Sequence, residues 1–238
     1  MVVKMNKYFN FMKIPGLMVK VMTAFPVTVK LVLFSLLFSL LIGFVFACMA
    51  LAKSKLLNAM AKGYIAFMRG MPILVLIFIF YFVMPLYLKK IGINAASWSK
   101  DSFIIATLSL TSAANMAEMM RSAYLSVDQH QWEAAYSVGM GNLTAFRRII
   151  FPQAFGVAIP VLGNNIIYIF KSTSLAFSIG AVDVFGRAKL ISSNLYGLNR
   201  AELYLGVSII FWTVSVLLEQ ITKWAERVYT KGKKIQII

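Results

Sequence analysis

The sequence predicts an all-α protein that crosses a membrane about five times. Of its 238 residues, 60% are hydrophobic and only 13% are charged, whereas a soluble globular domain carries about 25% charged residues. Several uncharged runs are long enough for a helix that spans the bilayer, which needs roughly 17–25 residues. Backbone groups in lipid must be satisfied within their own segment, so such runs predict helices.

Charged residues mark the ends of each predicted span. The five runs between them cover residues 31–52, 70–88, 102–121, 149–170 and 203–218, and only the third contains an internal acid, Glu118. The apolar residues 172–182 follow the fourth run directly but are too few to cross. We therefore expect a half-helix or re-entrant segment there, covered by protein or lining a water cavity.

A polar segment, residues 122–148, separates the third and fourth spans. Asp128 is placed as a helix cap, with Glu133 in the turns that follow. Gly139 and Gly141 indicate a turn between two short helices. A charged helical hairpin outside the membrane predicts a docking surface for another protein.

The composition disfavours several other classes. The formal net charge is +16, but the bases are scattered between apolar runs, which favours anionic lipid over nucleic acid as their partner. The single cysteine, Cys48, and the single histidine, His130, have no metal-ligand spacing, and we expect Cys48 to be a small buried hydrophobe. The sequence also has no phosphate-binding loop, so we expect no cofactor in this chain.

The segment between the two central spans carries a recognisable motif. Residues 132–152 read WEAAYSVGMGNLTAFRRIIFP, which resembles the EAA loop of ATP-binding-cassette (ABC) importer permeases. The matching positions are Glu133, Ala134, Ala135, Gly139, Ile149 and Pro152, with Phe151 where leucine is usual. Two further segments resemble the polar amino-acid branch of that family: FMRGMPILVLIFIFYF at residues 67–82 and LGNNIIYIFKSTSLAFSIG at residues 162–180. AYLSVDQHQWEAAYSVGM at residues 123–140 and AFSIGAVDVFGRAK at residues 176–189 resemble its cystine-type members.

The resemblance implies an architecture and a set of partners. Residues 28–225 would form an ABC transporter type-1 transmembrane domain, with its EAA coupling loop at 122–152. In that family the loop is cytoplasmic, which places residues 1–27 outside or at the interface and the basic tail 226–238 in the cytoplasm. The positive-inside rule does not decide the orientation, because the 24 Lys and Arg divide 12 to each side. The implied partners are a dimer of ATPase subunits that holds ATP and Mg, a second permease subunit (identical or a sister chain), an extracytoplasmic solute-binding protein and the bacterial cell membrane.

Polar residues inside the spans are candidates for the substrate path. Glu118 is either a path residue or the partner of Arg121 at the helix end, because burying an ionisable group in lipid is costly. The others flank the predicted break after span four: Asn164, Asn165, Ser172, Thr173 and Ser174. They either bind substrate or join helices by hydrogen bonds. Ser172 stands where related permeases often have aspartate, which favours a neutral substrate.

These observations predict the permease subunit of an ABC importer for an amino acid, with cystine or another polar amino acid favoured. ATP hydrolysis would belong to a partner chain, so the chain itself would not be an enzyme. The alternative is a passive channel or scaffold subunit without ATP coupling. An intramembrane enzyme is disfavoured, because one isolated cysteine and one loop histidine supply no catalytic constellation.

Overall fold

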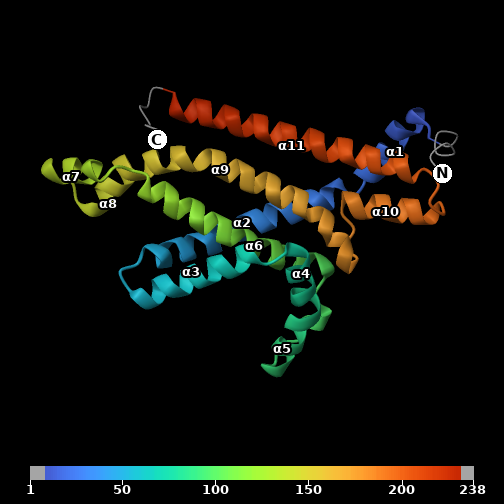
Figure 1. Ribbon diagram of the computed structural model, residues 1–238, viewed down its shortest axis with the longest axis horizontal. Coiled ribbons are helices and arrows are strands. Elements are labelled where there is room, and N and C mark those ends of the chain that lie inside the picture. Colours follow the sequence, from blue (N-terminus) through green and yellow to red (C-terminus); the bar gives the residue numbers. More distant parts are fainter. Residues whose placement is uncertain (1–8, 232–238) are drawn as a thin grey trace. The chain divides into compact units, whose positions relative to one another are not determined.

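The computed structural model describes residues 9–231, which are helical throughout apart from short connections, with no strand in that range. Five helical segments are long and apolar enough to cross a membrane, which confirms the predicted number of spans (Figure 1). They are Phe25–Leu51, Ile73–Lys90, Lys100–Leu125, Asn142–Ile179 and Arg200–Thr230.

The elements follow one another along the chain with few loops. Their bounds are η2 Phe11–Lys13, α1 Ile14–Met22, α2 Phe25–Leu51, α3 Lys55–Gly70, α4 Ile73–Phe78, η3 Ile79–Val83, α5 Met84–Lys90, η4 Ala95–Ser97, α6 Lys100–Leu125, α7 Gln129–Ser137, α8 Asn142–Ala145, η5 Phe146–Ile150, α9 Phe151–Ser172, η6 Thr173–Ile179, α10 Val184–Asn194 and α11 Arg200–Thr230.

Most spans run beyond the uncharged residues that predicted them. Helix α2 begins before Lys30, and α6 includes Lys100 and Asp101. Lys30 Nζ and Asp101 Oδ2 are 2.8 Å apart and form an ion pair. Long basic side chains at a helix end can lay their stems on apolar surface and keep the charge in water, so a charge does not end a membrane helix.

The chain divides into two compact units. Of the described residues, the first unit contains 9–35, 72–108 and 168–217, and the second contains 36–71, 109–167 and 218–231.

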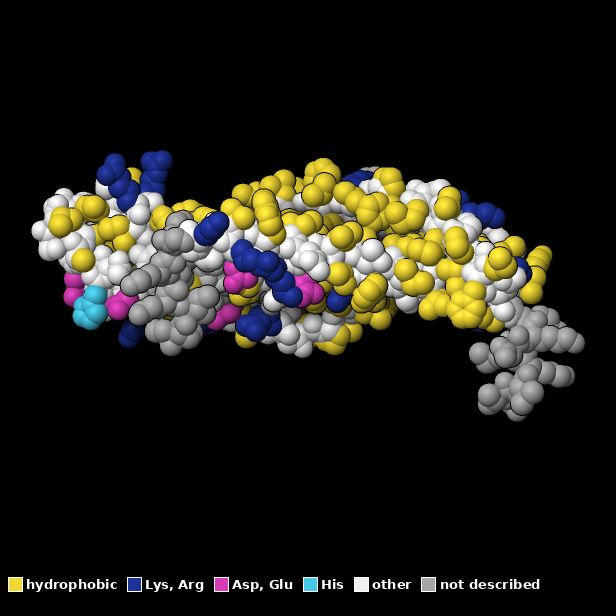
Figure 2. Space-filling model, turned by 90° about the horizontal axis from the view of Figure 1, so that it is seen from above, with side chains coloured by type: hydrophobic (Ala, Val, Ile, Leu, Met, Phe, Trp, Pro, Cys, Tyr) yellow, Lys and Arg dark blue, Asp and Glu magenta, His cyan; other side chains and the backbone are white. Residues whose placement is uncertain are grey.

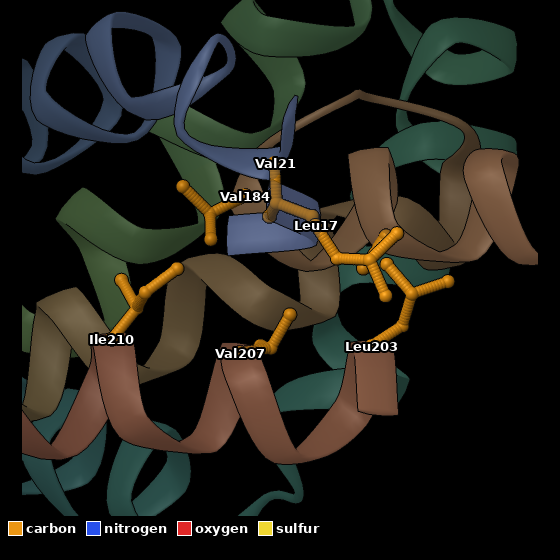
Figure 3. Packing of buried hydrophobic residues seen from close by; sticks show 7 residues of the cluster. Leu17, Val21, Val184, Leu203, Val207 and Ile210 are labelled. Carbon is orange, nitrogen blue, oxygen red and sulfur yellow. The ribbon is translucent and has the colours of Figure 1, made fainter. Parts of the chain in front are cut away.

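The first unit is held together by a cluster of aliphatic side chains from α1, α10 and α11. Figure 3 shows six of them pointing toward one another: Leu17, Val21, Val184, Leu203, Val207 and Ile210. On α1 the buried residues are Ile14, Leu17 and Val21, a spacing that places them on one face of the helix. The segment before the first span therefore packs as an amphipathic helix.

The second unit is built on close contact between α2 and α6. A Cβ added to Gly43 would lie 2.6 Å from the Cβ of Met116 and 3.0 Å from the carbonyl oxygen of Ala113. Small residues of this kind allow membrane helices to approach closely. Ala47, Ala114 and Ala117 extend this contact, which is buried together with Ile65 of α3.

The end of span four differs from the predicted half-helix. There is no break between Lys171 and Ser172: α9 continues directly into the 3₁₀ turns of η6, and the chain leaves the helix at Gly180, whose φ is +80°. The Thr173 and Ser174 hydroxyls donate to the carbonyls three residues earlier, each at 2.8 Å. Polar side chains that bond their own helix in this way do not need to interrupt it.

The expectation for Cys48 is wrong. Its side chain is exposed on α2, as are nearby Phe44 and Val45. In a membrane-spanning helix an apolar face turned away from the protein is solvated by lipid, so exposure of such a residue carries no penalty there.

Candidate functional site

The EAA motif forms the helical hairpin that the sequence predicts. Asp128 caps α7, because its side chain accepts a 2.9 Å hydrogen bond from the backbone N–H of His130. Helix α8 follows after a short turn and leads through η5 into α9, as Figure 1 shows. Within this unit, Gln131 and Gln153 are joined side chain to side chain at 3.3 Å, so α7 is also tied to the start of α9.

Gly139 makes the turn, as predicted. Its φ of +77° lies in the left-handed region, which glycine adopts at little steric cost. The N–H of Gly139 donates to the carbonyl of Tyr136 at 2.9 Å, and the N–H of Met140 donates to that of Ala135 at 3.0 Å. This pair of bonds is the Schellman arrangement that closes a helix. Gly141, by contrast, has a φ of −73°, which any residue can adopt.

Glu133 is held by side chains from the preceding turn of α7. Its Oε2 lies 3.1 Å from Nδ1 of His130, and its Oε1 accepts a 3.4 Å hydrogen bond from Nε2 of Gln129. The contact with Glu133 and the nearby charge of Asp128 raise the pKa of His130 above its ordinary value. The side chains of His130 and Glu133 are 82% and 58% exposed, so the carboxylate remains accessible to another protein.

The hairpin presents small and apolar residues beside this carboxylate. Ala134 is exposed, and Ala135 is buried against the rest of the hairpin. Three large apolar side chains are exposed there: Tyr136 (47%), Val138 (70%) and Leu143 (74%). Figure 2 shows hydrophobic side chains on this end of the unit. Exposed apolar groups on a segment outside the predicted spans are typical of a protein interface.

The last motif residues lie where the hairpin joins span four. Ile149 is half-buried within the π-helical turn Phe146–Ile150. Pro152 is in the first turn of α9, and its carbonyl accepts a 3.1 Å hydrogen bond from the hydroxyl of Tyr229 on α11. A movement of the hairpin would therefore act directly on two spans, α9 and α11.

Glu118 forms an ion pair near the end of α6. Its two oxygens receive bonds from Arg121, at 3.0 Å from Nε and at 2.6 Å from Nη2. Both side chains are about one third exposed. This is the helix-end pair that the sequence allows as an alternative to a path residue.

The two asparagines of span four have different surroundings. Asn165 is buried, and its Nδ2 donates to the carbonyl of Val161 at 3.1 Å. Asn164 is exposed on the isolated chain. Both belong to the second unit, whereas Ser172, Thr173 and Ser174 belong to the first. Ser172 and Thr173 are buried and Ser174 is half-buried.

Asp183 is a notable buried group that the sequence did not single out as a site residue. It is fully buried and caps α10, with Oδ1 accepting from the N–H of Gly186 at 2.8 Å. Its Oδ2 has no hydrogen-bond partner among the described residues. Burial raises the pKa of Asp183 to about 6, despite the backbone bonds that favour its charged form. An acid that directly follows an apolar run gives no signal of burial by itself.

Metal-binding side chains do not gather in the part of the chain that the structure describes. Residues 9–231 contain no group of three or more His, Cys, Asp or Glu able to hold an ion together.

Comparison with known proteins places the chain and its relatives in one family of transport proteins. Residues 39–231 match the family described as "Binding-protein-dependent transport system inner membrane component". The chain is 40% identical over 231 residues to the L-cystine transport system permease protein TcyL of Bacillus subtilis, covering 96% of this chain and 95% of that protein. It is 36% identical to the probable amino-acid ABC transporter permease protein PatM of Vibrio harveyi, covering 86% and 89% of the two chains.

A solved structure also resembles the chain closely. A crystal structure of an amino acid ABC transporter with histidines superposes with a TM-score of 0.79 at 27% identity, covering 92% of this chain and 98% of that one. The chain is a multi-pass membrane protein that belongs to the family of inner membrane components of binding-protein-dependent transport systems.

Proposed function

We propose that this chain is the translocating subunit of an ABC importer for an amino acid, with cystine or another polar amino acid favoured. The observation that carries the substrate class is the 40% identity, over almost the whole of both chains, to a relative named as an L-cystine permease. A second relative is named as an amino-acid permease, which supports the broader class.

In this proposal the hairpin α7–α8 is the docking site for a separate ATPase subunit, which supplies ATP and Mg. The exposed Glu133 and Ala134, with the apolar Val138 and Leu143 beside them, support this assignment. A short helix with small residues and one acid fits a groove in a partner that carries a base. The hairpin, and the basic tail at 226–238, would then lie in the cytoplasm, and residues 1–27 outside or at the outer interface.

Two further partners complete the proposed machine. A solute-binding protein would deliver the amino acid from outside, and a second permease subunit, identical or a sister chain, would form the other wall of the path. The residues proposed to line the path in this chain are Asn164, Asn165, Ser172, Thr173 and Ser174, whereas Glu118 pairs with Arg121 at the end of its helix instead. Ser172 in place of an acid supports a substrate without net positive charge.

The docking role is tested by reversing one charge. Glu133→Lys places a lysine opposite the basic groove of the ATPase, and like charges in an interface are strongly unfavourable. We expect ATP-driven uptake and copurification of the ATPase to fall together, while the amount of permease in the membrane stays unchanged. Glu133→Gln keeps the size and hydrogen bonding of the side chain and should have a smaller effect. Wild-type copurification with the lysine variant would disprove the docking assignment.

The path is tested by competition in vesicles. A unit charge about 4 Å from a substrate charge is worth roughly 4 kcal/mol at an effective dielectric of about 20. Ser172→Asp should therefore favour arginine or lysine as competitors of cystine uptake, whereas Ser172→Ala should not. The binding protein must be omitted or made permissive, because it selects substrate first. An unchanged substrate ranking in both variants would remove residue 172 from the path.

A further inference from the structure

A groove runs between α9 and α11 in the second unit, and the proposed function does not use it. Its volume is about 580 Å³. Aliphatic side chains from both helices line its length: Ile159, Leu162 and Ile166 of α9, and Ile221 and Val228 of α11. Ile221 and Val228 are 59% and 57% exposed. The groove is therefore an open apolar channel along a pair of membrane helices.

The floor of the groove is set by one close contact. A Cβ added to Gly163 would clash with Cγ2 and Oγ1 of Thr222, so the two helices touch there. Away from that point the larger side chains hold the helix surfaces apart. A flexible hydrocarbon chain fits such a space better than a rigid side chain does, because it can follow an irregular apolar surface.

One end of the groove has a different chemistry. Trp224 and Tyr229 line the groove toward the C-terminal end of α11, and Lys231 is the last residue that lines it. Trp224 is 65% exposed, and the Tyr229 hydroxyl is fixed by its bond to the carbonyl of Pro152. Tryptophan and tyrosine are enriched where membrane helices meet the headgroup layer.

Positive charge surrounds the same end. Arg227 lies four residues before Lys231 and so on the same side of the helix. Lys223 lies four residues earlier again, but its ammonium already pairs with Glu219 at 2.6 Å. Figure 2 looks onto α11 and shows charged side chains gathered toward its C-terminal end, with hydrophobic ones over its middle.

We propose that this groove binds one anionic phospholipid, with an acyl chain between Ile159 and Ile221 and the headgroup phosphate at Lys231 and Arg227. The apolar length, the aromatic residues and the cations occur in the order that such a lipid presents. Basic pockets between membrane helices are known to hold anionic headgroups. A second copy of the chain docked with its twofold axis at this end of the groove would bring Lys231 and Arg227 toward their own counterparts, so charge favours the lipid there.

A lipid in the groove would lie against a residue that is hydrogen-bonded to the end of the EAA motif. Tyr229, which lines the groove, donates its hydrogen bond to Pro152, the last residue of the EAA motif. A lipid held against Tyr229 would stabilise the joint between α9 and α11 next to the hairpin.

Brominated lipids test the proposal, because bromine quenches tryptophan only at contact. The full chain is prepared with Trp224 alone or Trp212 alone, the other three tryptophans being replaced by phenylalanine. Trp212 is the matched control: it lies on the same helix, is 68% exposed and does not line the groove. Each variant is reconstituted in mixed phosphatidylglycerol and phosphatidylcholine vesicles in which one lipid or the other is brominated.

We expect Trp224 to prefer phosphatidylglycerol over phosphatidylcholine about 25-fold more strongly than Trp212 does, since each of the two bases near the membrane surface contributes about fivefold. Lys231→Gln should lower the preference at Trp224 about fivefold, and Lys231→Gln combined with Arg227→Gln should bring it down to that at Trp212. Equal preferences at the two positions in the parent variants would overturn the proposal. A second result would also overturn the proposal: Trp224 is quenched by neither lipid, and Val228→Cys in a Cys48→Ala background forms a disulfide between two copies of the chain. That result would assign the groove to a second copy.

The chain with all its tryptophans provides an independent readout. Native mass spectrometry should show phosphatidylglycerol retained by the wild type and by Lys90→Gln, and lost from Lys231→Gln. Lys90 is a suitable control because it lies at the end of another membrane span, with its ammonium 5.3 Å from the centre of the Tyr87 ring. Equal retention by the two variants would contradict the assignment.

Discussion

Two glycines in the coupling hairpin offer a controlled test of how its turn is built. A Cβ added to Gly139 or to Gly141 would meet nothing within 4 Å, so neither substitution causes a clash. The two positions differ in backbone conformation, with φ of +77° at Gly139 and −73° at Gly141. Replacing each by alanine therefore isolates the cost of the left-handed conformation.

The expected magnitudes differ. Alanine in the left-handed region costs about 1–2 kcal/mol, so Gly139→Ala should weaken the closed turn by that amount. Gly141→Ala should change the turn little, because the entropy gain of about 0.4–1 kcal/mol is offset by the loss of glycine at the N-cap of α8, where glycine is preferred over alanine. A difference of about 1–2 kcal/mol corresponds to roughly a 5- to 30-fold change in the ratio of closed to open hairpin.

Hydrogen exchange measured by mass spectrometry reads this ratio. The amides of Gly139 and Met140 both donate to carbonyls of α7, so their protection reports whether the turn is closed. We expect faster exchange across α7 and lower ATP-driven uptake in Gly139→Ala, and neither change in Gly141→Ala. Equal exchange in the two variants would refute the argument that the turn requires a left-handed residue.

Three further predictions concern titration and packing. The pKa of Asp183, about 6 in the folded chain, lies above its ordinary value, so the folded state binds the proton more tightly. Stability should fall as pH rises from about 4 to 6, by up to about 3 kcal/mol, and melting of Asp183→Asn in detergent should lack this dependence. The pKa of His130 is also raised. Its contact with Glu133 should raise the protection factors of the α7 amides below pH 6.5 and lose this effect as pH rises through the raised pKa, whereas the protection factors in His130→Gln should not vary with pH. Gly163→Ala should lower the melting temperature, because overpacking against Thr222 costs about 1–3 kcal/mol; unchanged melting would show that the helices separate freely.

The spans and the hairpin could be predicted because their causes are local. Five runs without charge meet the length that a bilayer requires, and the structure has a helix at each of them. Asp128 and Gly139 act through bonds to residues within one or two turns, so their roles can be recognised from sequence spacing alone.

Other features depend on contacts between distant segments and escaped prediction. Helix α3 carries three bases among its apolar residues, so a search for uncharged runs passes over it. Helix α1 packs its apolar face against α10 and α11, which are more than 150 residues away. The burial of Asp183 arises in the same way, since the neighbouring N–H of Val184 bonds to Thr28 on α2. At span four, Ser172 and its polar neighbours suggested a break, but the Thr173 and Ser174 hydroxyls bond within the helix and Gly180 ends it instead.

The central claim, that this chain is an amino-acid permease driven by a separate ATPase, is tested most directly by uptake into proteoliposomes. The chain is reconstituted with its ATPase and solute-binding protein, and entry of labelled cystine is followed with and without ATP. The account predicts concentrative uptake that requires all three proteins and ATP hydrolysis. Unlabelled polar amino acids that the binding protein accepts should compete with cystine, and Glu133→Lys should abolish uptake. Equilibration of cystine by the chain alone, unaffected by ATP or by Glu133→Lys, would contradict it and identify a passive channel.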